Sequence, residues 1–205
     1  MTCEVAKRDT RMGLGSAEAK KGSAARRAAN WHFLERRHLM VPMIESIASE
    51  LSDEAVTTRR VLERVPADKL AWKPHQRSKS LGELAMHVAS IPAMAERIAK
   101  HDEFAAGGGT PAVAGSAEEI LAAFERNVRA AEEALDGMTE QTASGSWRLI
   151  FRGKEVFSKP RVKALRTNML NHMYHHRGQL TVYLRLLDVP VPMVYGPTAD
   201  ENPFA

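Results

Sequence analysis

The sequence has a single cysteine, Cys3, among its 205 residues. One thiol cannot build an intramolecular disulfide framework or a thiolate metal cluster, so both are excluded. The first 30 residues also lack the continuous apolar stretch of a secretory signal. We therefore expect the chain to work in a reducing compartment, the cytoplasm.

Long apolar stretches are missing as well. The runs of apolar residues are short and interrupted by charge, so we expect no segment that spans a bilayer and no membrane partner. Aromatic residues are few at 6%, but the apolar fraction of 44% and the charged fraction of 26% are normal for a soluble globular protein. The length is sufficient for one domain with a substantial core.

The positive charge of the chain belongs to one end. Residues 1–39 contain nine Lys or Arg and four Asp or Glu, a net charge of +5, whereas the rest contains 20 bases and 21 acids. The globular part therefore has no basic excess that would suggest a phosphate backbone, and we expect no nucleic-acid partner.

The N-terminal extension and the domain differ in pattern. Residues 1–39 are rich in Ala, Gly, Ser, Lys and Arg and show little apolar periodicity. This composition predicts a disordered or loosely docked extension, followed by a domain over residues 40–205. An alternative is a structural bundle whose basic extension is a nucleic-acid-binding arm.

Four segments carry the apolar periodicity of amphipathic helices. Capping-box pairs begin two of them, Ser80 with Glu83 and Ser116 with Glu119. Pro92 should kink the second helix, because it cannot donate a hydrogen bond to the carbonyl four residues earlier. The expected helices cover approximately residues 42–65, 80–98, 116–138 and 160–187.

The linker before the last helix is not helical in pattern. Trp147, Leu149 and Phe151 stand at alternate positions, and residues 152–154 can form a turn, so a short hairpin is expected there. Four long helices around one core predict an all-α fold, with an up-down four-helix bundle as the architecture.

The last helix carries a cluster of histidines. His172 and His176 are four residues apart, which places them about 40° apart around a helix, so both imidazoles can reach one ion. Leu165, Met169 and Leu186 are expected on the same, core-facing side. His175 lies to the other side of His172 and is the weaker candidate.

A third histidine on another helix would complete a catalytic type of metal site. Such sites have three protein ligands and one open position. Only His87 lies on an inward-facing stripe, between Leu84 and Ile91. The alternative is a hydrogen-bonded core histidine. Burying three imidazoles is costly unless each finds a partner, and one ion would satisfy three lone pairs at once.

Three segments resemble a known family. WKPHQRSKSLGELAMH, residues 72–87, looks like the first histidine motif of the DinB superfamily, also called YfiT-like metal-dependent hydrolases. Residues 171–187 resemble its second motif, and residues 191–201 are similar to the C-terminus of many members. Together the segments extend in order over about residues 41–201.

The resemblance implies a fold and a site. It implies an up-down-down-up four-helix bundle with a three-histidine metal site, here His87, His172 and His176, that holds one divalent ion, Ni²⁺ or Zn²⁺. Members are frequently dimers, so a homodimer is expected. Characterised relatives include thiol S-transferases and a mycothiol-dependent isomerase, whereas many members have no demonstrated activity.

Three neutral ligands leave the charge of a divalent ion uncompensated, so it can lower the pKa of a bound water or thiol. The chain lacks HExxH, so no glutamate stands beside the ligands as a base. The sequence thus favours a metal-dependent enzyme acting on a small molecule, either a hydrolase or a low-molecular-weight thiol S-transferase. A non-catalytic metal-binding stress-response protein is the alternative.

Two polar residues continue the ligand stripe. Gln179 and Tyr183 are candidates to touch substrate or to orient a water, and the alternative for each is a polar core residue with satisfied hydrogen bonds. Arg177 is expected to point away from the stripe, in a structural role or at a dimer contact. From their place in the motifs, three residues are expected at the mouth of the site: Trp72, His75 and Tyr195.

Overall fold

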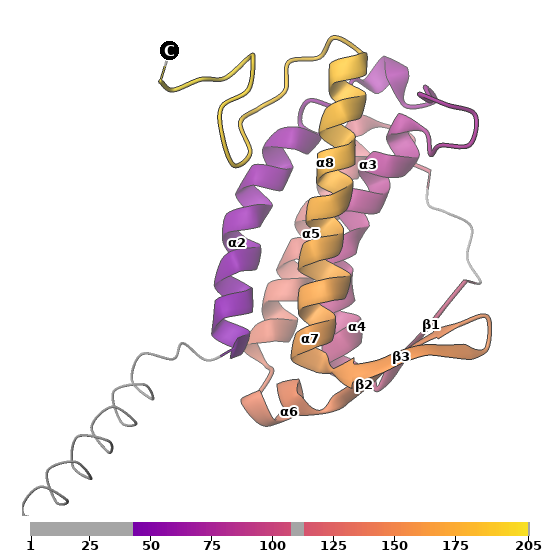
Figure 1. Cartoon of the computed structure of the whole chain (residues 1–205), viewed down its shortest axis with the longest axis vertical. Helices are drawn as coiled ribbons and strands as arrows, with labels where there is room; N and C mark the ends of the chain where they lie inside the picture. Colours follow the sequence, from indigo (N-terminus) through magenta and orange to yellow (C-terminus); the bar gives the residue numbers. More distant parts are fainter. Residues whose placement is uncertain (1–42, 108–112, 205) are drawn as a thin grey trace, which may run out of the picture. The chain divides into compact units, whose positions relative to one another are not determined.

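The computed structural model describes residues 43–107 and 113–204 (Figure 1). The predictions for the extension over residues 1–39, including the nucleic-acid-binding arm, lie outside the described residues. In the part that is described, no helix is both long enough and apolar enough to cross a bilayer.

Four helical segments surround one core. They run up, down, down and up in chain order, and each packs against two others (Figure 1). Of the two central segments, the first begins at a complete capping box and bends at Pro92 as predicted, through one 3₁₀ turn. The segments are α2 (Met43–Leu62), α3 (Leu81–Ser90) with η2 (Ile91–Ala93) and α4 (Met94–Lys100), α5 (Ala117–Asp136), and α7 (Arg161–Leu165) with η3 (Arg166–Leu170) and α8 (Asn171–Leu186).

The expectation of an all-α fold is wrong in one respect, because a small mixed sheet lies beside one end of the bundle (Figure 1). The predicted hairpin is present as β2 (Ser146–Phe151) and β3 (Lys154–Pro160), which pair antiparallel. Arg152 and Gly153 both have positive φ, which suits the tight turn between two strands. A third strand, β1 (Glu103–Ala106), pairs parallel with β2 and was not predicted.

One short helix also lies in the linker that lacked a helical pattern. α6 (Glu140–Ser144) is a single turn whose N-cap is Thr139, and the Thr139 hydroxyl accepts a hydrogen bond from the backbone N–H of Thr142. A segment of five residues is too short to show periodicity, which is why the sequence pattern did not reveal it.

The two capping boxes are formed to different extents. Ser80 Oγ accepts from the backbone N–H of Glu83, and the Glu83 carboxylate accepts from that of Ser80, at 3.2 and 2.6 Å. At the start of α5, Ser116 caps Glu119 in the same way, but the Glu119 carboxylate accepts from Gly115 instead. The complete box fixes the start of α3, six residues before His87.

A buried arginine joins the sheet to the bundle. Arg161, at the start of α7, donates hydrogen bonds of 2.9 Å to the carbonyl oxygens of Ile98 and Ser146, and it pairs with the exposed carboxylate of Asp102. These contacts connect the end of α4, the start of β2 and the first turn of α7. The last helical segment is therefore anchored next to the sheet.

Replacement of Arg161 by methionine is expected to lower the free energy of unfolding by about 2–4 kcal/mol, because it leaves two carbonyl oxygens without their donor. Arg148→Met is the matched control, since Arg148 is exposed on the same sheet and its ion pairs with Glu103 and Glu155 should contribute less than about 1 kcal/mol. Urea unfolding measures both, and equal losses in the two variants would contradict this role of Arg161.

Candidate metal centre

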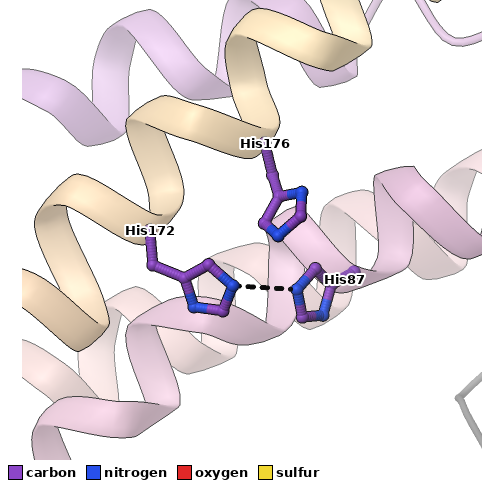
Figure 2. Close-up of side chains that lie close together, drawn as sticks. All are labelled: His87, His172 and His176. Carbon is purple, nitrogen blue, oxygen red and sulfur yellow. Dashed lines mark hydrogen bonds between the residues drawn. The ribbon is translucent and has the colours of Figure 1, made fainter.

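The structure brings the three predicted histidines together. His87 projects from α3, and His172 and His176 project from successive turns of α8 toward it (Figure 2). One ring nitrogen from each lies within 4.8 Å of the others, and His87 Nε2 and His172 Nε2 are 3.2 Å apart in a hydrogen bond. This arrangement could hold a metal ion, because three imidazole nitrogens can point to one centre.

The cluster is electrostatically neutral at pH 7. Burial lowers the pKa of His87 to about 4, with the charges of His176 and His172 acting in the same direction. Burial also makes the largest contribution to the lowered pKa values of His172 and His176. Neutral imidazoles offer lone pairs, which is the form in which histidine binds metals.

Neighbouring groups orient two of the rings. His176 Nδ1 lies 2.7 Å from Gln179 Oε1, and an amide oxygen can only accept, so Nδ1 carries the proton and Nε2 has the lone pair. His172 hydrogen-bonds to the backbone of Asn168, one turn earlier. Such second contacts fix the tautomer and the direction of a ligand.

The helix that supplies two of the ligands is not uniform. The predicted last helix is present, but it contains one π-helical turn, η3, closed by a hydrogen bond from the Asn171 N–H to the Arg166 carbonyl. π turns inside α-helices occur frequently at functional sites. Here the turn ends two residues before His172 and contains Asn168, which lines the same cavity as His172.

A cavity of about 440 Å³ adjoins the cluster. His87 and His172 lie in its wall, together with residues of η2, α4, α5 and the first two strands of the sheet. The unpredicted strand β1 therefore matters for the site, because it contributes Phe104 to this wall. A cavity of this size suits a small-molecule ligand.

Gln179 and Tyr183 have partners within the protein. Gln179 contacts His176, as described above, rather than the cavity. The Tyr183 hydroxyl donates to the Lys79 carbonyl at 3.3 Å, and its ring packs edge-on against Trp72. Neither residue is part of the cavity wall, and a direct contact of either with substrate stays a prediction.

The three residues expected at the mouth do not gather there. None of Trp72, His75 and Tyr195 belongs to the wall of the cavity beside His87. His75 is exposed in a loop, and Tyr195 contacts Arg177 and Glu54 on another side of α8. Proximity within a sequence motif was an insufficient guide, because the loop and the tail fold away from the cavity.

Arg177 lies in the core, on the side of α8 that faces α2. It is 1% exposed and points away from the histidines into structural contacts, as expected. Its guanidinium donates to Glu54, Thr58 and the Tyr195 hydroxyl. A signal was present in the sequence, since an apolar series at four-residue or three-residue spacing passes directly through this position: Leu165, Met169, Met173, Leu180 and Leu184.

Comparison with known proteins places the chain in a family. The model of the DinB family matches residues 40–202, so the chain belongs to the DinB family. No curated protein matches. The family match and the shared fold leave the reaction open.

Solved structures show the same fold. A DinB-like protein from Bacillus cereus ATCC 10987 is 25% identical, with a TM-score of 0.58, covering 74% of this chain and 97% of that one. A DinB-like protein from Bacillus subtilis has 18% identity and a TM-score of 0.55, with coverages of 73% and 97%. A DinB family protein from Exiguobacterium sibiricum 255-15 has 21% identity and a TM-score of 0.53, with coverages of 75% of this chain and 97% of that one.

The lowered pKa values predict how acid affects the metal-free protein. The pKa of His87 is about 4 when folded and near 6.5 when unfolded, so between these values the unfolded chain binds more protons. Stability should therefore fall as the pH is lowered from 6.5 to 4. Urea unfolding at pH 7 and pH 4.5 should show a smaller loss in His87→Gln than in the wild type.

His75→Gln is the control for this prediction, because His75 is exposed and lies outside the cluster. It should retain the full loss of stability at pH 4.5. If the loss were unchanged in His87→Gln, the burial of a neutral His87 would not be its cause.

Proposed function

We propose that this DinB family protein is a metal-dependent enzyme of the cytoplasm that transfers a low-molecular-weight thiol to a small electrophilic molecule. One observation supports this most: three neutral imidazoles converge at the edge of a cavity of small-molecule size. His87, His172 and His176 would hold one divalent ion, for which Ni²⁺ and Zn²⁺ are both suited to imidazole ligands.

The residues fit a catalytic rather than a structural metal. Structural zinc sites have four protein ligands, whereas this cluster contains three. A divalent ion bound there supplies a Lewis acid that lowers the pKa of a thiol or a water at its remaining position. Gln179 and Asn168 support the proposal by holding two of the rings in fixed orientations.

Thiol transfer is favoured over hydrolysis by the chemistry of the surroundings. Among the described residues, no Asp or Glu lines the cavity beside His87, so a base for the activation of water is missing there. A thiol has an ordinary pKa about 7 units below that of water and needs less help to lose its proton. Hydrolysis remains the second candidate, since the same ion would serve both reactions.

The chain's own residues then have two roles. The three histidines hold the ion, and the apolar side chains of the cavity exclude water from the ligand. Because the histidines are already neutral at pH 7, metal binding requires no net loss of a proton from the cluster. A homodimer is also expected from the family resemblance, and it is not required for the three-histidine site, which lies within one chain.

The metal prediction is tested on the untagged full chain. Supplemented with Ni²⁺ or Zn²⁺ and then dialysed, the wild type should retain about one ion per chain by elemental analysis, because three ligands converge. The double variant His87→Ala/His172→Ala should retain none, and the exposed-histidine variant His75→Ala should match the wild type. A wild type without metal after supplementation would overturn the proposal.

The reaction is tested separately from metal binding. The metal-loaded chain is mixed with a panel of thiols and chromogenic electrophiles, and with nitrophenyl esters in the absence of thiol. Thiol-dependent product that the histidine double variant does not form is the expected result. Ester cleavage without thiol would identify a hydrolase, and bound metal without any turnover would favour the non-catalytic metal-binding alternative.

A further inference from the structure

The wall of the cavity beside the histidines includes residues of one helical segment, α3, η2 and α4, from His87 to Arg97. The two residues are ten positions apart, which corresponds to roughly 15 Å of helix. A ligand that occupies the whole cavity therefore has one end near the histidines and the other near the guanidinium of Arg97.

The walls between these two ends are mostly apolar. Met94 of α4, Phe104 of β1 and Leu149 of β2 contribute apolar surface. The polar groups of the wall are neutral: Asn168 belongs to the π turn, and the Asn127 amide donates to the carbonyl of Ala89 at 2.9 Å. A ligand with a polar or charged middle would lose hydration there without recovering it.

Arg97 is held in place without an acidic partner. Its guanidinium lies over the ring of Phe104, 4.6 Å from the centroid, and one of its nitrogens lies 3.8 Å from the Met94 sulfur. Across residues 43–107 and 113–204, no carboxylate lies within ion-pair distance of this guanidinium, although most other arginines described here have one. The neighbouring Lys100 pairs with Glu96 instead.

We propose that the cavity binds an anionic small molecule with an apolar middle, and that Arg97 recognises its carboxylate while its opposite end reaches the three histidines. A guanidinium presents a planar set of donors that matches a carboxylate, and Arg97 and the Phe104 ring on which it stacks both line the cavity. The absence of acidic side chains from the described wall means that nothing repels an anion. The position of the histidine end rests on the proposed function, whereas the Arg97 end does not.

The first experiment uses probes with a thiol at one end. Full-length chain loaded with Co²⁺ is titrated with ω-mercaptooctanoic acid and with its primary amide, and binding is followed by thiolate-to-cobalt absorption in the near ultraviolet. The acid should bind about tenfold more tightly, as expected for a charge-assisted hydrogen bond at a partly exposed site. Mercaptoacetate, which is too short to reach both ends, should gain nothing from Arg97.

Matched variants distinguish a specific effect of Arg97 on binding from a general effect of positive charge. Arg97→Gln should bind the acid and the amide equally, and Arg97→Lys should restore part of the preference, because it retains the charge without the planar donor set. Lys100→Gln removes one positive charge from the same helix but lies outside the cavity, so it should retain the tenfold preference. A preference that survives in Arg97→Gln, or that is absent from the wild type, would overturn the inference.

A second arm keeps the inference distinct from the metal proposal. Metal-free full-length chain is titrated calorimetrically with octanoate and octanamide, for which no metal is needed. A preference for octanoate that Arg97→Gln abolishes supports the role of Arg97 even if Co²⁺ fails to bind, and the failure of Co²⁺ then counts against the proposed function alone. Equal binding of octanoate and octanamide counts against Arg97 whatever the metal does.

Discussion

The arrangement of the site depends on three imidazoles that face one another between α3 and α8. Each is half-buried, and burial lowers the pKa of each. The three imidazoles are therefore neutral at pH 7, and protonating any of them is unfavourable. One hydrogen bond, between His87 and His172, uses one donor and one lone pair. The lone pair of His176 Nε2 gains most from a shared cation, since its other nitrogen is committed to Gln179.

The rest of the bundle supplies the fixed positions that this cluster needs. The complete capping box at Ser80 determines where α3 starts and therefore which way His87 points. On the other side, Arg177 follows His176 directly in α8, and its buried hydrogen bonds to Glu54 and Thr58 hold α8 against α2. A rotation of α8 about its axis would break these bonds, so the direction of His176 is coupled to a contact on the opposite helix face.

The sequence alone predicted more of the fold than of the metal ligands. Four amphipathic segments, two capping signals and the hairpin are local patterns, and each appears in the structure close to its expected position. The metal ligands needed two arguments, because the four-residue spacing identified only His172 and His176, and His87 became specific through the family motifs. Their convergence within 4.8 Å is a tertiary fact that no spacing contains.

What the sequence did not reveal depends on contacts between distant segments. β1 has four residues, and it becomes a strand only because β2, more than 40 positions later, offers a partner. The burial of Arg177 also depends on a distant segment, because its guanidinium donates to Glu54 and Thr58 of α2. The cavity and the place of Arg97 in it could not be predicted for the same reason, because the wall of the cavity is formed by helices and strands that only the fold brings together.

Charge is distributed differently on the two sides of α8, and this difference bears on what the cavity can bind. On the α2 side, Glu50 accepts from Arg166 and from the Tyr174 hydroxyl, and Glu54 accepts from Arg177, so the acids there are balanced by bases. On the cavity side, the described wall contains no acid at all. Lone pairs of neutral imidazoles attract a divalent ion at short range, and that ion would add positive potential to a cavity that already ends at Arg97. Metal loading should therefore strengthen the binding of anions in the cavity, because two positive groups then act on the same ligand from its two ends.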